Sequence, residues 1–77
     1  MLAGCGGKPK TAAQRVADCL NAKDFLVGPA GGRVEGTSPR GVAFSVVVAS
    51  GTIDDRGNPG KRRLSPTDRR SIEACLD

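Results

Sequence analysis

Apolar residues recur every three or four positions between residues 12 and 20, which places them on one face of an α-helix. The positions are Ala13, Val16, Ala17 and Leu20. Thr11 and Gln14 have the spacing of a capping box, in which each side chain bonds a backbone amide at the helix start. The sequence therefore predicts a helix that begins after Thr11 and runs to about Ala22.

A second pattern, strict alternation, fills the middle of the chain and is typical of a β-strand. Large apolar side chains stand at Val42, Phe44, Val46 and Val48, and they alternate with Ala43, Ser45, Val47 and Ala49. This pattern predicts a central strand over residues 42–50 with its bulky face against the helices. The apolar run 25–27 predicts a buried strand and residues 33–35 a second short one, with turns at 31–32 and 38–41.

A second helix is expected near the end of the sequence. Ser65 fits an N-cap, Pro66 the first helical position, and Asp68 an acid in the first turn. The apolar positions form one narrow stripe: Ile72, Cys75 and Leu76. The order helix, two to three antiparallel strands, helix predicts a small two-layer α+β sandwich with both helices on one sheet face.

The composition limits the chemistry open to this chain of 77 residues. It holds no His, Trp or Tyr and two Phe, which excludes imidazole acid–base catalysis, His-activated nucleophiles and imidazole metal ligands. We therefore expect no enzyme activity, no cofactor and no metal site. No apolar run is long enough to span a bilayer, and so short a chain builds a marginal core without a covalent staple.

The first ten residues contain three glycines and a proline and show no apolar periodicity. They are expected to form a flexible tether, residues 1–10, ahead of one domain, residues 11–77. The run Leu2-Ala3-Gly4-Cys5 resembles the lipobox of bacterial lipoproteins at all four positions. Met1 directly precedes the box, so the charged and apolar segments that open such signals would belong to a longer precursor.

In the lipoprotein family, the chain is cut before the cysteine of the box, which then carries lipid such as palmitate. The resemblance therefore implies lipid attachment at Cys5. It also implies a cell-envelope location, on the extracytoplasmic face of the bacterial cell membrane or outer membrane. A cytoplasmic location is the alternative.

The cysteine count supports the same interpretation. With Cys5 assigned to lipid, Cys19 and Cys75 remain as an even pair on the apolar faces of the two predicted helices. A disulfide between them would persist in an oxidising compartment. The alternative is that both are reduced, small apolar residues of a cytosolic protein.

The net charge is +4, and the basic residues concentrate in one part of the chain. The candidate basic surface consists of Arg56, Lys61, Arg62, Arg63, Arg69 and Arg70. Such a surface can contact phosphate groups of nucleic acid or of lipid headgroups. Both Phe are expected in the core, which leaves no aromatic side chain for stacking on bases and favours an ordinary solvated surface.

Adjacent acids, Asp54 and Asp55, open a polar loop over residues 54–60 that is expected to be solvated and mobile at its tip. Calcium loops need oxygen ligands at alternate positions, and catalytic acids need a shared cleft, so neither role is expected.

Two functions follow from these features. The first is a small lipid-anchored envelope protein without enzyme activity, which binds a protein or peptide. The second is a cytosolic or phage-encoded basic module that binds nucleic acid or a host protein.

Overall fold

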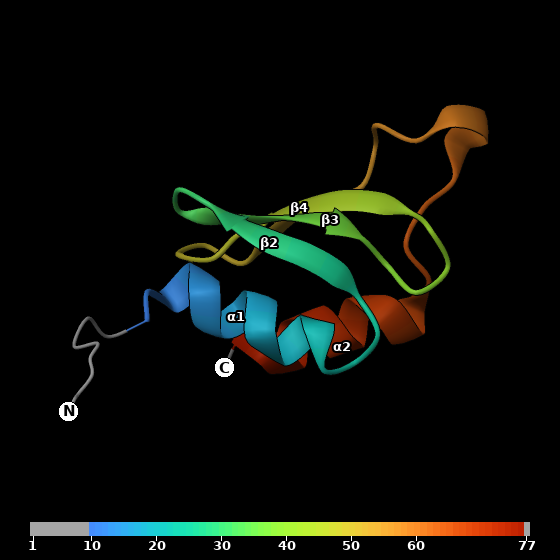
Figure 1. Cartoon of the computed structure of the whole chain (residues 1–77). Helices are drawn as coiled ribbons and strands as arrows, with labels where there is room; N and C mark the ends of the chain where they lie inside the picture. Colours follow the sequence, from blue (N-terminus) through green and yellow to red (C-terminus); the bar gives the residue numbers. More distant parts are fainter. Residues whose placement is uncertain (1–9, 77) are drawn as a thin grey trace, which may run out of the picture.

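The computed structural model describes residues 10–76. These residues form a four-stranded antiparallel sheet with two helices on one of its faces (Figure 1). The elements in order are α1 (Ala12–Asn21), β2 (Leu26–Ala30), β3 (Arg33–Thr37), β4 (Ala43–Val47), β5 (Thr52–Asp54), the 3₁₀ turn η1 (Pro59–Lys61) and α2 (Pro66–Leu76). Each strand pairs with its neighbour in the sequence, in the order β2-β3-β4-β5. The predicted α+β class is confirmed, with helices at both ends of the chain order and the sheet between them.

Helix α1 begins as its sequence predicts. The Thr11 hydroxyl accepts a hydrogen bond from the Gln14 amide at 3.1 Å, and the Thr11 amide donates to Gln14 Oε1 at 2.9 Å. Both halves of the capping box are therefore present, and they satisfy two amides that the first helical turn leaves without partners. The helix ends at Asn21 with Ala22 as its C-cap, close to the predicted boundary.

Strand β4 has the predicted alternation. Val42, Phe44 and Val46 are buried, and Ala43 and Val47 are exposed. The strand ends at Val47, three residues before the expected boundary, because the chain turns at residues 48–51. The Gly51 amide donates to the Val47 carbonyl at 2.7 Å, and Gly51 has a left-handed φ of 74° that suits glycine.

The sheet has four strands, whereas two to three were expected, because the chain turns at residues 48–51 and forms a further strand. After this turn, Thr52–Asp54 pairs back onto β4 as β5. Three residues are too few to show an alternation, so no local pattern marks this strand.

Strand β2 differs from the buried strand expected at residues 25–27. Phe25 is buried just before the strand, but Leu26 is 75% exposed on the face opposite the helices. The strand continues through Pro29 to Ala30. It is an edge strand, where a residue without an amide proton can face away from the neighbouring strand.

The outer side of β2 is occupied by a helix side chain. Asn21 Oδ1 accepts a hydrogen bond from the Val27 amide, and Asn21 Nδ2 donates to the Val27 carbonyl, both at 3.0 Å. Asn21 thereby provides the two hydrogen bonds that a residue of a neighbouring strand would make with Val27.

The core lies between the sheet and the helices. Its most deeply buried large side chains are Phe25, Leu20, Ile72, Val34 and Val46. The rings of Phe25 and Phe44 meet edge to face with centroids 5.8 Å apart, a favourable geometry for aromatic pairs. Gly36 allows β2 to approach β3, since a Cβ there would lie 2.0 Å from the Leu26 carbonyl oxygen.

A disulfide between Cys19 and Cys75 joins α1 to α2, with the two Cα atoms 5.7 Å apart. The sequence predicts this pair.

Helix α2 begins with its predicted N-cap, because the Asp68 amide donates to the Ser65 hydroxyl at 3.1 Å. No helix within residues 10–76 is both long and apolar enough to cross a bilayer.

Candidate functional site

Residues 55–64, here called the strap, form a closed loop that connects β5 to α2 and stands off the sheet (Figure 1, orange). Its two ends meet: the amide of Leu64 donates a hydrogen bond to Asp55 Oδ2 at 2.9 Å. A compact loop of this length with adjacent ends has the geometry of an Ω-loop, a class that often carries function.

Asp55 fastens the strap to α2. Its side chain is 3% exposed, Arg69 Nη2 lies 3.1 Å from Oδ2, and Arg63 Nη1 lies 3.9 Å from Oδ1. Burial by itself would raise the pKa of Asp55. The Leu64 amide and the guanidinium groups of Arg69 and Arg63 outweigh that effect, so the pKa lies below its ordinary value. The expectation of a solvated loop is wrong for this residue, because its charge is paired inside the protein.

Asn58 fastens the middle of the strap to the sheet. Asn58 Oδ1 accepts from the Ala43 amide, and Asn58 Nδ2 donates to the Ala43 carbonyl, both at 2.7 Å. The same nitrogen donates to the Asp55 carbonyl at 3.0 Å. Strand β5 ends opposite Ser45, so Asn58 occupies the stretch of β4 that β5 does not reach.

The strap gathers part of the candidate basic surface. Four exposed cations lie on it: Arg56, Lys61, Arg62 and Arg63. The remaining two, Arg69 and Arg70, lie on α2, where Arg69 bonds Asp55. The structure therefore divides the six predicted residues into a group on the strap and a pair on the helix.

Arg40 is a further cation at this end of the molecule. Arg62 Nη2 donates to the Arg40 carbonyl at 2.8 Å, which brings the turn at residues 38–41 beside the strap. Sequence reasoning missed Arg40, because the two arginines are 22 positions apart and only the tertiary fold brings them together.

The open sheet face is the face that the helices leave uncovered. Its residues, by strand register, form rows of Leu26, Thr37 and Ala43, then Gly28, Glu35, Ser45 and Asp54, then Ala30, Arg33, Val47 and Thr52. Most of them are small or polar, and the two large exposed hydrophobic residues of the described chain, Leu26 and Val47, are among them. A shallow hollow of about 240 Å³ lies where this face meets the strap, lined by Ala43, Phe44, Ser45, Asp54 and Gly57.

The adjacent acids Asp54 and Asp55 do not form a joint site. Asp54 Oδ1 accepts from the Arg56 amide at 3.1 Å and lies 3.3 Å from Arg56 Nε. The backbone amide and then the guanidinium of Arg56 hold the pKa of Asp54 below its ordinary value. Asp55 instead faces Leu64 and Arg69. Within residues 10–76, no group of three or more His, Cys, Asp or Glu side chains could hold a metal ion.

The other predicted site residues are the cysteines. Cys19 and Cys75 form the disulfide already described. Cys5, the predicted lipid site, lies outside the described residues, as does the tether apart from Lys10. The Lys10 ammonium forms an ion pair with Asp18 of α1.

No family model, curated protein or solved structure matches the chain.

Proposed function

We propose that this protein is a small lipid-anchored protein of the bacterial cell envelope, held by lipid on Cys5 and without enzyme activity. Its folded domain binds a protein or peptide partner on the extracytoplasmic side. The observation that carries the proposal is the Cys19–Cys75 disulfide. Disulfides persist in oxidising compartments and are rare in the cytosol, and small exported domains commonly depend on them.

The disulfide also supports the assignment of lipid to the third cysteine. Two of the three cysteines pair with each other, and Cys5 is the one that stands in the sequence Leu2-Ala3-Gly4-Cys5. A lipobox supplies chemistry for that thiol, since the lipoprotein pathway attaches lipid to it. The short segment between Cys5 and Thr11 then serves as the tether.

The open sheet face supports a binding role. Backbone groups at two edge positions of the sheet are already paired with side chains, Val27 with Asn21 and Ala43 with Asn58. A partner that adds a strand at either edge would have to displace the side-chain amide of Asn21 or of Asn58. The open sheet face needs no such displacement, and its small side chains let a partner approach closely, with Leu26 as an exposed apolar contact.

The anchor is tested by fractionation of a bacterium that expresses the full-length precursor, native or with Cys5→Ser. Native protein is expected in the membrane fraction, and Cys5→Ser is expected to lose that retention. Lys8→Ala serves as the control, because it leaves the box intact and should stay in the membrane. A native precursor found in the cytosol would overturn the proposal and favour the basic cytosolic module.

A further inference from the structure

We propose that the strap, together with Arg40, binds the phosphate headgroups of an anionic lipid bilayer. This inference rests on the proposed function, because it takes the bilayer to be the surface at which the domain is held. It assigns the domain a second membrane contact, separate from the lipid at Cys5.

The first argument is the balance of charge on the strap. Five exposed cations lie at this end of the molecule: Arg40, Arg56, Lys61, Arg62 and Arg63. Arg56 pairs with Asp54 at 3.3 Å. Arg63 lies 3.9 Å from the carboxylate of Asp55, and Arg69 lies closer to it, at 3.1 Å. Arg40, Lys61 and Arg62 form no ion pair with any residue from 10 to 76. Their charge is therefore available to an external anion.

The second argument is that the backbone of the strap is held in place before any ligand binds. It is fastened at its ends by Asp55 and Leu64, in its middle by Asn58, and near Arg62 by the carbonyl of Arg40. Fixing a surface in advance reduces the conformational entropy that binding would otherwise cost.

Lys61 adds an observation of its own. It has a φ of 60° beside Gly60 at 68°, so a bulky residue adopts the left-handed backbone region that favours glycine. Such a conformation costs free energy, and conformations of this kind concentrate at binding sites. Here it places a lysine at the tip of the strap, next to Arg62.

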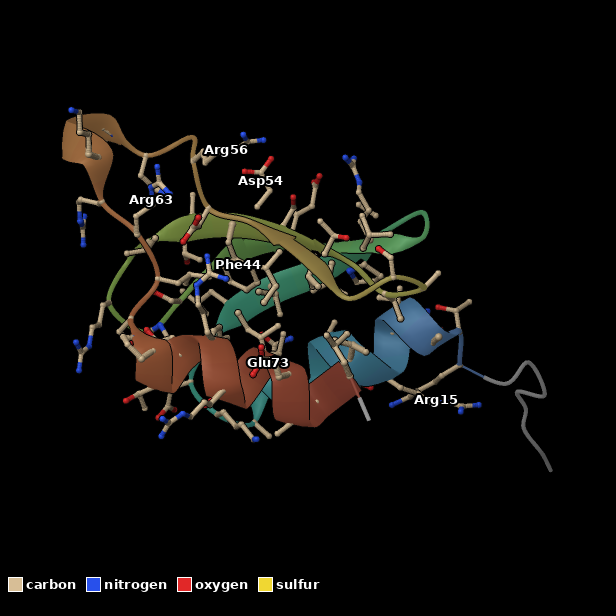
Figure 2. The ribbon with its side chains drawn as sticks, turned by 180° about the vertical axis from the view of Figure 1, so that it is seen from behind. Arg15, Phe44, Asp54, Arg56, Arg63 and Glu73 are labelled. Carbon is tan, nitrogen blue, oxygen red and sulfur yellow. A yellow bond between two sulfur atoms is a disulfide. The ribbon has the colours of Figure 1, made fainter. Side chains whose placement is uncertain are left out.

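The shape of the strap favours a bilayer over nucleic acid. The strap projects from the sandwich, and Arg56 and Arg63 lie on it, whereas Arg15 lies at the opposite end of the molecule (Figures 1 and 2). A projecting loop can touch a flat array of headgroups. Proteins that bind single-stranded nucleic acid combine a basic groove with aromatic side chains, and the strap contains no aromatic residue. Guanidinium groups suit phosphate, because their donors match its oxygens in pairs.

Because the tether holds the domain near the bilayer, a weak affinity of the strap and Arg40 for headgroups is sufficient for contact. Six residue steps separate Cys5 from Thr11, a span of at most about 20 Å, so lipid on Cys5 keeps the strap near the headgroups at high effective concentration. Helix α1 begins at the opposite end of the sandwich from the strap (Figure 1). Contact at both ends would lay the domain along the bilayer.

The experiment uses the full chain with Cys5→Ser, so that no lipid contributes. Its binding is measured by co-sedimentation with vesicles of phosphatidylglycerol and phosphatidylcholine in equal parts, and with vesicles of phosphatidylcholine alone. The test variant is Arg40→Gln/Lys61→Asn/Arg62→Gln, which removes the three cations that form no ion pair within the described part of the chain. Asn tolerates the left-handed backbone at position 61, and Gln at position 62 retains a donor for the Arg40 carbonyl. The control is Arg15→Gln/Lys23→Gln/Arg70→Gln, which removes the same charge elsewhere.

Binding is expected only to the anionic vesicles and is expected to weaken as salt rises. Each cation at such a surface contributes about five-fold, so the test variant should bind about 100-fold more weakly and the control should bind nearly as the parent. Thermal melts establish that both variants are folded. Should the test variant fail to fold, Arg40→Gln alone, outside the strap, replaces it, with an expected loss of about five-fold.

Three outcomes overturn the inference: no binding of the parent chain to anionic vesicles at low salt, equal losses in strap and control variants, or tighter binding to duplex DNA than to the vesicles. The anchor proposal survives any of them, because fractionation of the precursor tests Cys5 alone. Conversely, a precursor that is never lipidated leaves the vesicle result unchanged.

Discussion

Asp54 and Asp55 are neighbours in the sequence and have opposite surroundings in the fold. Asp54 is exposed and bonds Arg56, two residues away, whereas Asp55 is buried and bonds Leu64 and Arg69. The difference arises because β5 ends at Asp54, and successive side chains of an extended chain point to opposite sides. One of the two carboxylates is therefore part of the surface, and the other holds the strap closed.

Asp55 makes the stability of the domain depend on pH in the acid range. The pKa of Asp55 is lower in the folded chain than its ordinary value of 3.8, so around that pH the unfolded chain binds more protons than the folded one. The stabilisation from its charge is present above about pH 4 and is lost as the pH falls through the lower pKa of the folded state. We expect Asp55→Asn to lower the free energy of unfolding by about 1–3 kcal/mol at neutral pH.

Denaturant unfolding at a series of pH values from neutral to acid measures this effect. Asp55→Asn should flatten the acid part of the profile relative to the parent. Asp54→Asn is the matched control, and it should change the neutral stability little because its ion pair is exposed to solvent. Equal losses in the two variants would contradict the role assigned to Asp55.

At the scale of elements, the parts of the fold that could be predicted are those that depend on local sequence. Both helix starts follow from side chains that bond amides three residues away, at Thr11 and at Ser65. The face of β4 follows from its alternation. The exposure of Leu26 could not be predicted, because an apolar run of three residues does not show which side of a sheet each one faces.

The same distinction applies to the candidate site. The Cys19–Cys75 pair could be predicted because each cysteine lies on the apolar stripe of its own helix. The strap could not, because its closure depends on Asp55 reaching Leu64, nine residues later, and on Asn58 reaching back to Ala43. Such contacts leave no periodic signal in the sequence.

Strand β4 carries a prediction at this scale, because its two faces provide their own control. Phe44 is 5% exposed and packs against Phe25, whereas Val47 points to the open sheet face. Phe44→Ala should lower the free energy of unfolding by about 3–5 kcal/mol, most of what so small a domain has. Val47→Ala should change it by less than about 0.5 kcal/mol.

Thermal melts of the two variants measure the difference. At this size, each kcal/mol moves the midpoint by about 4–8 °C, so Phe44→Ala is expected to be largely unfolded at ambient temperature. A Phe44→Ala midpoint equal to that of Val47→Ala would show that the interior face of β4 contributes little.

For the whole molecule, the disulfide is the covalent link that holds the two helices together beneath the sheet. It joins residues 56 positions apart, and closing a loop of that length in the unfolded chain contributes about 4 kcal/mol in the chain-entropy treatment. Paired replacement Cys19→Ser/Cys75→Ser should lower the free energy of unfolding by about that amount. Denaturant titrations measure it, and Cys5→Ser, which leaves the bridge intact, should unfold at the parent midpoint.

The order of the strands has a consequence for how the thiols find their partners. Each strand pairs with the one before it, so α1 and the whole sheet can assemble as the chain emerges, before α2 exists. During that interval Cys19 is already in place while Cys75, 56 residues later, is not. Cys5, only fourteen positions away, is then the nearest competing thiol in the sequence. Lipid on the Cys5 sulfur would remove that competitor, so acylation would also direct oxidation of Cys19 toward Cys75.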